Sequence, residues 1–197
     1  MGAVPFLRIL APLALVAGLV TACGHSSSSN GSAGSTGDAS STTLQLRPVA
    51  ARYAQDTSQG QEQLGPQTPK DLVDAMKGYD CTSQPAEVQG KLMECDAARN
   101  VFLLDAPLIT GGVSSAKALK IGSSHQWYVK VVFDKEAAAT LSQAVDSSLG
   151  SELAVVLDGK VLTAVVVDPG LKDGHLGITG DLDQQQASTL AGQVDGA

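Results

Sequence analysis

The sequence predicts an α+β fold, a two-layer sandwich of a mainly antiparallel sheet with two or three helices, preceded by a disordered N-terminal tether. Residues 127–133 alternate between apolar and other positions, as a half-buried strand does. Asp158-Gly159 joins two apolar runs and favours a type I′ hairpin. Helical spacing of apolar residues recurs in 134–150 and 183–194. The expected order β-α-β-β-(β)-α is typical of this class.

The N-terminus predicts a lipoprotein signal peptide over residues 1–22. One cation, Arg8, precedes the apolar run 9–20, which is too short to span a bilayer as a mature helix, and small residues lead to Cys23. Cys23 would become the first residue and carry acyl chains that anchor the protein in the bilayer. The alternative is an ordinary secretory signal with an incidental cysteine. We expect a lipid-anchored protein on the extracytoplasmic face of the cell membrane.

Residues 23–43 predict a tether behind the lipidated cysteine. After Cys23 this segment is mostly Ser, Gly and Thr and has no large apolar side chain, so it has nothing with which to form a core. A coil of this length spans roughly 25 Å. The remaining residues, 44–197, have the size of one domain. They include no apolar run long enough to cross a membrane, so lipid is the expected anchor.

The charge of the chain disfavours two classes of partner. Lys and Arg number 13 and Asp and Glu 20, for a formal net charge of −7, and loss of Arg8 with the signal makes the mature chain one unit more negative. Such a balance disfavours nucleic acid and anionic lipid surfaces as partners.

The three cysteines divide between lipid and a disulfide. With Cys23 assigned to lipid, Cys81 and Cys95 remain in an oxidising compartment, which favours a bond between them. A two-cysteine metal site and two free thiols are the alternatives. The three histidines have no ligand spacing to one another or to the cysteines, so we expect no metal.

The first part of the domain predicts a strand, a loop and a helix. Residues 44–47 alternate and end at Pro48, which favours a short edge strand. Residues 51–67 are polar and rich in Gln, as in a loop.

The helix is expected to begin with Thr68 as its cap and Pro69 in its first turn, and to end at Gly78. Its apolar stripe consists of Leu72, Val73 and Met76.

The second part predicts most of the sheet. Residues 101–104 form an apolar run suited to a buried strand, and Gly111 and Gly112 lie in a turn-rich passage. The buried face of strand 127–133 is expected to consist of Trp127, Val129, Val131 and Phe133. Residues 176–179 are expected to add a strand.

Two capped helices complete the fold. Asp134 caps the first, which ends at Gly150, and its buried stripe is Ala138, Leu141, Val145 and Leu149. Asp183 and Gln186 form a capping box for the last helix. Its inward residues are Ala187, Leu190, Ala191 and Val194.

The sequence predicts no enzyme, no cofactor and no catalytic residue. His25 lies in the Ser-rich tether, which cannot hold a nucleophile and a base in register. His125 precedes a strand at the surface, and His175 lies in a Gly-rich turn as a hydrogen-bonded loop residue. Turn and cap duties explain the remaining aspartates, Asp168, Asp173, Asp181 and Asp183, whose spacing does not match a calcium loop.

Several segments resemble a known family in order along the chain. They are Leu103-Leu104, Ile109-Thr110-Gly111, Val113-Ser114-Ser115-Ala116, Trp127-Tyr128-Val129, Phe133-Asp134, residues 153–161, Ile178-Thr179-Gly180 and Leu190-Ala191. This set resembles the first periplasmic domain of SecD, especially its head subdomain, over residues 101–194. Residues 44–49 resemble the strand that follows the first SecD membrane helix, and the cysteine pair resembles actinobacterial SecD sequences. Family members usually read Ser-Ala-Pro where this chain has Thr163-Ala164-Val165, and the membrane part of SecD with its proton-relay carboxylates has no counterpart.

The resemblance implies a division of the chain and a function. Residues 44–100 would form a SecD-like base segment with the disulfide, and residues 101–197 a head-like subdomain. The implied function is a non-enzymatic lipoprotein that binds secreted polypeptides or the Sec translocon as an accessory to protein export.

An envelope lipoprotein that binds a small ligand, or a sensor with the same fold, is the alternative. Strand addition needs an exposed sheet edge and a shallow apolar groove, whereas a small ligand needs an enclosed pocket with convergent polar groups. We expect the turns at Gly111-Gly112 and at 170–177, with Lys172 and His175, to supply the contact surface.

Overall fold

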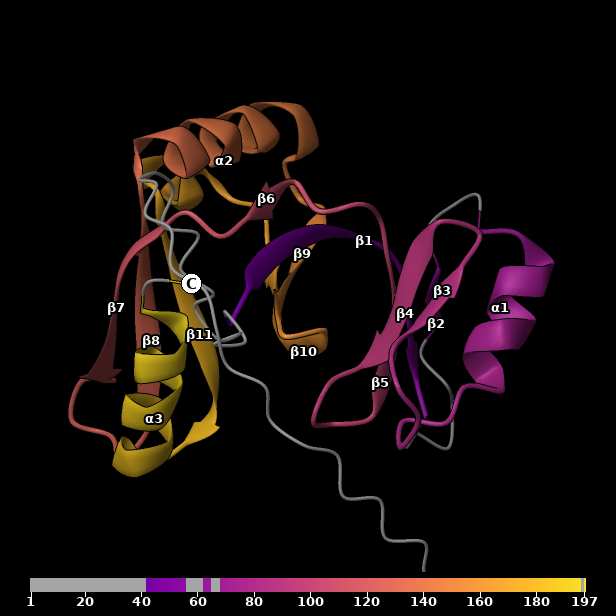
Figure 1. The fold of residues 1–197 in the computed structure, drawn as a ribbon, viewed down its shortest axis with the longest axis horizontal. Coiled ribbons are helices and arrows are strands. Elements are labelled where there is room, and N and C mark those ends of the chain that lie inside the picture. The colour runs from indigo at the N-terminus through magenta and orange to yellow at the C-terminus, as the bar shows by residue number, and fades with distance from the viewer. Residues whose placement is uncertain (1–41, 56–61, 65–67, 196) are drawn as a thin grey trace, which may run out of the picture. The chain divides into compact units, whose positions relative to one another are not determined.

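A computed structural model describes residues 42–55, 62–64, 68–195 and 197 (Figure 1). The predicted signal peptide and nearly all of the predicted tether lie outside this part of the chain. The strands are β1 (Leu44–Ala54), β2 (Glu62–Leu64), β3 (Ala86–Val88), β4 (Lys91–Cys95), β5 (Asn100–Leu104), β6 (Ile109–Thr110), β7 (Val113–Lys120), β8 (Trp127–Phe133), β9 (Glu152–Leu157), β10 (Lys160–Val166) and β11 (His175–Leu182). The helices are α1 (Lys70–Lys77), α2 (Lys135–Ser148) and α3 (Gln184–Val194), with a 3-10 turn, η1 (Pro169–Asp173).

The predicted fold class is confirmed. Strands β10, β9, β1, β5, β4 and β3 follow one another in one sheet, with β2 and β6 paired to β1, and β11, β8 and β7 form a second sheet. All of these pairs are antiparallel. Three helices complete an α+β sandwich. No helix within the described ranges is long and apolar enough to cross a membrane.

The prediction of a short edge strand over 44–47 is wrong, because β1 is a central strand of 11 residues. Its first half pairs with β9 and its second half with β5. Pro48 lies where the partners change: it is the last residue aligned with β9, and its carbonyl accepts a hydrogen bond from Asp105 N at 3.0 Å. A register shift follows it, so the missing N–H of Pro48 falls at an irregularity that tolerates it.

The predicted loop over 51–67 is also wrong in part. Residues 51–54 complete β1, and β2 pairs with them in the register Arg52↔Gln63. The polar composition concealed this pair, because β-propensity reports mainly how a side chain fits its neighbours.

The start of α1 differs from the prediction by one residue. Pro69 is the N-cap, with no capping side-chain hydrogen bond, and its carbonyl accepts from Leu72 N and Val73 N, each at 3.1 Å. The ψ of Pro69 is 145°, so the proline precedes the helix, and Pro69 occupies the N-cap position predicted for Thr68. Gly78 ends the helix as predicted, and Leu72 and Met76 are buried.

The main core lies between the three-stranded sheet, the β1–β9–β10 strands and helices α2 and α3. Predicted members from β8 and the helices are buried there: Val129, Val131, Phe133, Leu141, Val145, Ala187, Ala191 and Val194. Leu149 is not, and the prediction that it faces inward is wrong. The helix ends at Ser148, and Leu149 is the extended C-cap with 61% of its surface exposed.

The helix caps and the hairpin turn predicted in the second half of the chain are confirmed. Asp134 Oδ1 accepts from Glu136 N and Ala137 N at 3.0 and 2.9 Å, and Asp183 and Gln186 form the predicted capping box. Asp158 and Gly159 have φ of 49° and 82°, the signs of a type I′ turn. The sequence missed the hairpin β3–β4, although its turn residues Gln89 and Gly90 also have positive φ.

Candidate functional site

The predicted contact residues Gly111 and Gly112 have a packing role. A Cβ on Gly112 would lie 2.9 Å from the Cβ of Ala137, and φ of Gly112 is +74°. Its carbonyl accepts from Asp134 N at 2.8 Å, while Gly111 N donates to Leu44 O at 2.7 Å. The pair therefore lets β6 and the first turn of α2 approach closely.

Lys172 and His175 lie in η1 and at the start of β11. Lys172 of η1 forms an ion pair with Asp146 of α2. The prediction of a loop position for His175 is wrong: it begins β11 opposite Val132. Its Nδ1 is buried and has no hydrogen-bond partner within the described residues. The contacts of the described residues therefore do not bring the predicted contact residues together at one site.

Two hollows border α2. One, of about 300 Å³, is bordered by Gly112, Asp134 and Glu136, and the other, of about 260 Å³, by Pro48, Leu153 and Val167. Leu108 and Thr140 line both. Each is open to solvent and mixes polar with apolar walls, so neither resembles the enclosed pocket that a small ligand needs.

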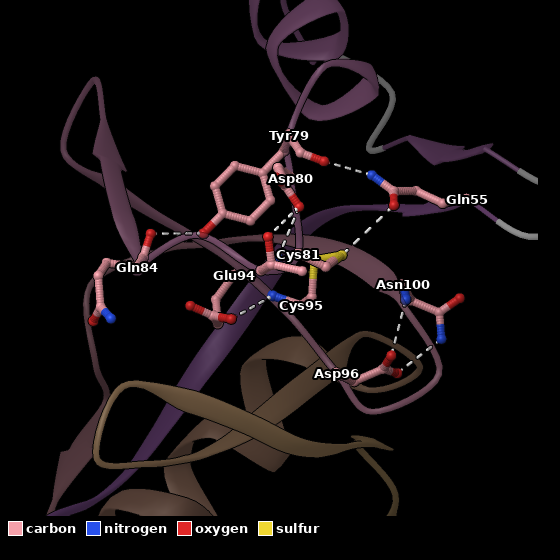
Figure 2. The surroundings of a disulfide bond; sticks show 10 residues. Gln55, Tyr79, Asp80, Cys81, Gln84, Glu94, Cys95, Asp96 and Asn100 are labelled. Carbon is pink, nitrogen blue, oxygen red and sulfur yellow. Dashed lines mark hydrogen bonds between the residues drawn. A yellow bond between two sulfur atoms is a disulfide. The ribbon is translucent and has the colours of Figure 1, made fainter. Parts of the chain in front are cut away.

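Cys81 and Cys95 form a disulfide that joins the segment after α1 to β4 (Figure 2). Gln55 Nε2 donates to Tyr79 O at 2.6 Å, and Tyr79 Oη donates to Gln84 O at 3.0 Å. Burial raises the pKa of Tyr79, and the nearby Glu94 adds to this effect. These contacts attach α1 and its exit loop to the sheet.

The same loop is stiffened by Asp80. Its carboxylate accepts from the backbone N–H of Thr82 at 2.9 Å and from the Thr82 hydroxyl at 2.8 Å, and these bonds lower the pKa of Asp80. Within the described ranges no group of three or more His, Cys, Asp or Glu side chains is placed to hold a metal.

A surface that the sequence did not predict lies at the edge strand β7. Within the described residues, β7 pairs with β8 and with no other strand (Figure 1). Ala116 N turns away from β8 and donates to Asp195 Oδ1 at 2.9 Å, and Ile121 N donates to Gln126 O on the β8 side at 2.9 Å.

The direction of the backbone hydrogen-bonding groups alternates along β7, and this alternation shows which of them face the open edge. Because successive residues of an antiparallel strand direct their N–H and C=O to opposite edges, Ala118 and Lys120 share the orientation of Ala116. The carboxylate of Asp195 accepts the outward N–H of Ala116. Among the described residues, none forms a hydrogen bond with the outward N–H or C=O of Ala118 or Lys120. Such an edge is a template for an added strand.

A groove of about 460 Å³ runs between this edge and α3. Its walls are Ala116, Lys117, Ala118, Leu119, Ser188, Ala191, Gly192 and Asp195. The helix contributes mainly small residues, and a Cβ on Gly192 would meet nothing within 4 Å. Leu119 and Ile121, with 37% and 39% of their surfaces exposed, add apolar area at the far end of β7. Free backbone groups, a shallow groove and exposed apolar side chains therefore coincide here.

The sequence contains only a weak signal for this site. Ala116 and Ala118 pack against the core while Lys117 and Leu119 are exposed, which is a strand alternation. Ala, Ser and Lys are poor strand formers, so β7 is recognised through its pairing with β8.

Comparisons with known proteins agree on one family. The model of the family described as "SecDF, P1 head subdomain" matches residues 87–197. The protein translocase subunit SecD of Acetobacter pasteurianus is 32% identical over 79 residues, which cover 40% of this chain and 15% of that protein. The SecD of Syntrophobacter fumaroxidans is 30% identical over 92 residues, 46% of this chain and 17% of that protein. The chain thus spans less than a fifth of the length of these two relatives.

Solved structures of SecDF are also similar to this chain, with lower sequence identity than these relatives. A crystal structure of SecDF in its super-membrane-facing form has a TM-score of 0.49 and 23% identity, and the match covers 78% of this chain and 18% of that one. A crystal structure of the SecDF of Thermus thermophilus has a TM-score of 0.41 and 22% identity, with 78% and 19% covered.

Proposed function

This chain belongs to the SecDF P1 head subdomain family, and on that premise we propose that it is an extracytoplasmic accessory to protein export that binds extended segments of secreted polypeptides at the β7 edge. The relatives named above are protein translocase subunits. One similar solved structure is described as SecDF, a membrane component that enhances protein export. A role in the handling of exported proteins is what these names share.

The proposal includes the anchor inferred from the sequence. Residues 1–22 would be removed, and acylated Cys23 would hold residues 44–197 near the membrane through the tether. This location would bring the domain near the translocon, so we include Sec components among its proposed partners. The proposed activity is binding without catalysis.

The open β7 edge is the observation that carries the proposed function. An added strand is held mainly by backbone hydrogen bonds, which any sequence offers, so such a site suits a protein with many clients. Ala118 and Lys120 supply the outward donors and acceptors, and the groove beside α3 accepts side chains on one face of the added strand.

Gly192→Phe tests the site. The space around Gly192 leaves room for the new side chain over the groove, and Phe is a better helix former than Gly, so the fold should hold. We expect the affinity of the full chain for a labelled unfolded secretory polypeptide to fall roughly tenfold, equivalent to about 1.4 kcal/mol. Gln193→Phe is the matched control, because Gln193 is exposed on the same helix and does not line the groove.

The measurement is a binding titration by fluorescence anisotropy, with thermal unfolding of each variant in parallel. Equal affinity of the two variants would remove the β7 edge as the site. A wild-type chain without affinity for unfolded polypeptides would overturn the binding function itself and favour the small-ligand or sensor alternative.

A further inference from the structure

The outer face of the three-stranded sheet carries two lysines directly opposite each other. In the β7–β8 register Lys117 aligns with Lys130, and Leu119 aligns with Tyr128. The neighbouring residues Val129 and Val131 are buried in the main core, so Lys130 and Tyr128 lie on the opposite face. Like charges at directly opposed positions destabilise a sheet.

Within the described residues, these lysines lack the ion-pair partner that several other cations have. Ion pairs within the described residues include Arg52 with Glu152, Lys70 with Asp74, Lys91 with Asp105 and Lys172 with Asp146. None of them includes Lys117, Lys120 or Lys130, although the chain has 20 acidic residues against 13 basic ones. Within the described residues, the opposed pair therefore has no carboxylate in ion-pair contact.

A strand added at β7 would bring its own side chains to this face. The client residue opposite Lys117 lies on the face of Lys117, with its Cβ about 4.5–5.5 Å away from the Cβ of Lys117. A carboxylate there would neutralise the opposed lysines. The client residues on either side of it point toward α3, where the groove holds the carboxylate of Asp195. The two faces of the added strand thus meet opposite charges.

We infer that the β7 edge selects client segments in which acidic side chains alternate with small or apolar ones, the acidic ones lying over Lys117 and Lys130. This inference rests on the proposed function, because it requires strand addition at β7. It names the class of polypeptide: acidic, extended and alternating, bound to the cationic face of an otherwise acidic domain. Small residues Ser188, Ala191 and Gly192 leave room for its apolar side chains.

Three blocked, labelled peptides of eight residues test it with the full chain. In them Val alternates with Glu, with Thr or with Lys, so backbone and apolar content are matched. We expect the Glu peptide to bind about fivefold more tightly than the Thr peptide, the scale of a cross-strand charge pair of about 1 kcal/mol. The Lys peptide should bind most weakly, and added salt should narrow the differences.

Lys117→Glu should reverse the order of the Glu and Lys peptides. The variant removes a like-charge contact with Lys130, so its thermal unfolding should stay at or above that of the wild type. Lys160→Glu is the control, because Lys160 is exposed on β10 and outside the second sheet, and it should keep the wild-type order.

The outcomes distinguish the charge selection from strand addition itself. Equal binding of all three peptides, or an unchanged order in Lys117→Glu, would overturn the charge selection while leaving strand addition in place. Absence of binding by all three peptides would overturn strand addition, and the charge selection with it.

Discussion

Single glycines set how closely α2 approaches the rest of the domain. Gly112 faces Ala137 and Gly174 faces Ala138, where an added Cβ would lie 2.9 and 2.6 Å from the alanine Cβ. Both glycines also have positive φ, +74° and +69°, which side chains rarely adopt. The first turns of α2 are therefore held on two sides by residues that lack a side chain.

Gly112→Ala should lower the free energy of unfolding by about 1–3 kcal/mol, because it combines an unfavourable φ with overpacking against Ala137. Gly192→Ala is the control, and it should be neutral or stabilising by up to about 1 kcal/mol, because that helical position is open. Urea denaturation of both variants measures the difference. Equal stability of the two would contradict the close-approach role of Gly112.

At the scale of elements, α1 and its exit loop depend on few anchoring contacts. Leu72 and Met76 pack in a small cluster with Met93 and Val101, and the loop is attached through Cys81, Tyr79 and Gln55. This cluster is separate from the main core around α2 and α3. Both cysteines of the disulfide pack in the smaller cluster, Cys95 as a buried member and Cys81 as a partly buried one.

Replacing Cys81 and Cys95 together by Ser should lower the free energy of unfolding by about 2–4 kcal/mol, because the bond closes a short loop and restricts the unfolded chain. Denaturant unfolding with and without reductant gives the value, and the reduced wild type is the control for the substitution itself. Non-reducing peptide mapping should show the linked pair. Free alkylation of both thiols in the exported protein would contradict the bond.

At the scale of the whole domain, one strand links two groups of elements. The first half of β1 pairs with β9, and its second half pairs with β5 and β2. Strand β5, at the start of the predicted head-like segment, shares a sheet with β4 of the predicted base segment. The boundary between residues 100 and 101 therefore falls inside a continuous set of paired strands, and it stays a prediction.

The proposed lipid anchor concerns the whole chain, and Cys23→Ser tests it. Loss of the thiol would remove the proposed lipidation site, so we expect the protein to leave the membrane fraction of fractionated cells. Thermal unfolding of residues 44–197 should be unchanged, since position 23 precedes the predicted domain in the sequence. Ser26→Ala, next to the same site, should remain in the membrane fraction. Equal retention of Cys23→Ser and wild type would contradict the lipid anchor.

The sequence by itself determined the local features of this domain. The caps at Asp134 and Asp183, the Asp158-Gly159 hairpin and the alternation in 127–133 all follow from interactions within a few residues. They were predictable because a helix start or a tight turn depends on short-range hydrogen bonds and allowed φ values.

The tertiary structure alone decided the position of β1, the exposure of Leu149 and the candidate site. Strand β7 has weak propensity, and its open edge, the groove beside α3 and the opposition of Lys117 to Lys130 exist only once β7 pairs with β8 and α3 packs beside it. The sequence placed its contact residues at glycine turns, whereas the structure uses Gly112 for packing. The choice of strand partners and the exposure of an edge arise from contacts between residues far apart in the chain, and local patterns do not encode them.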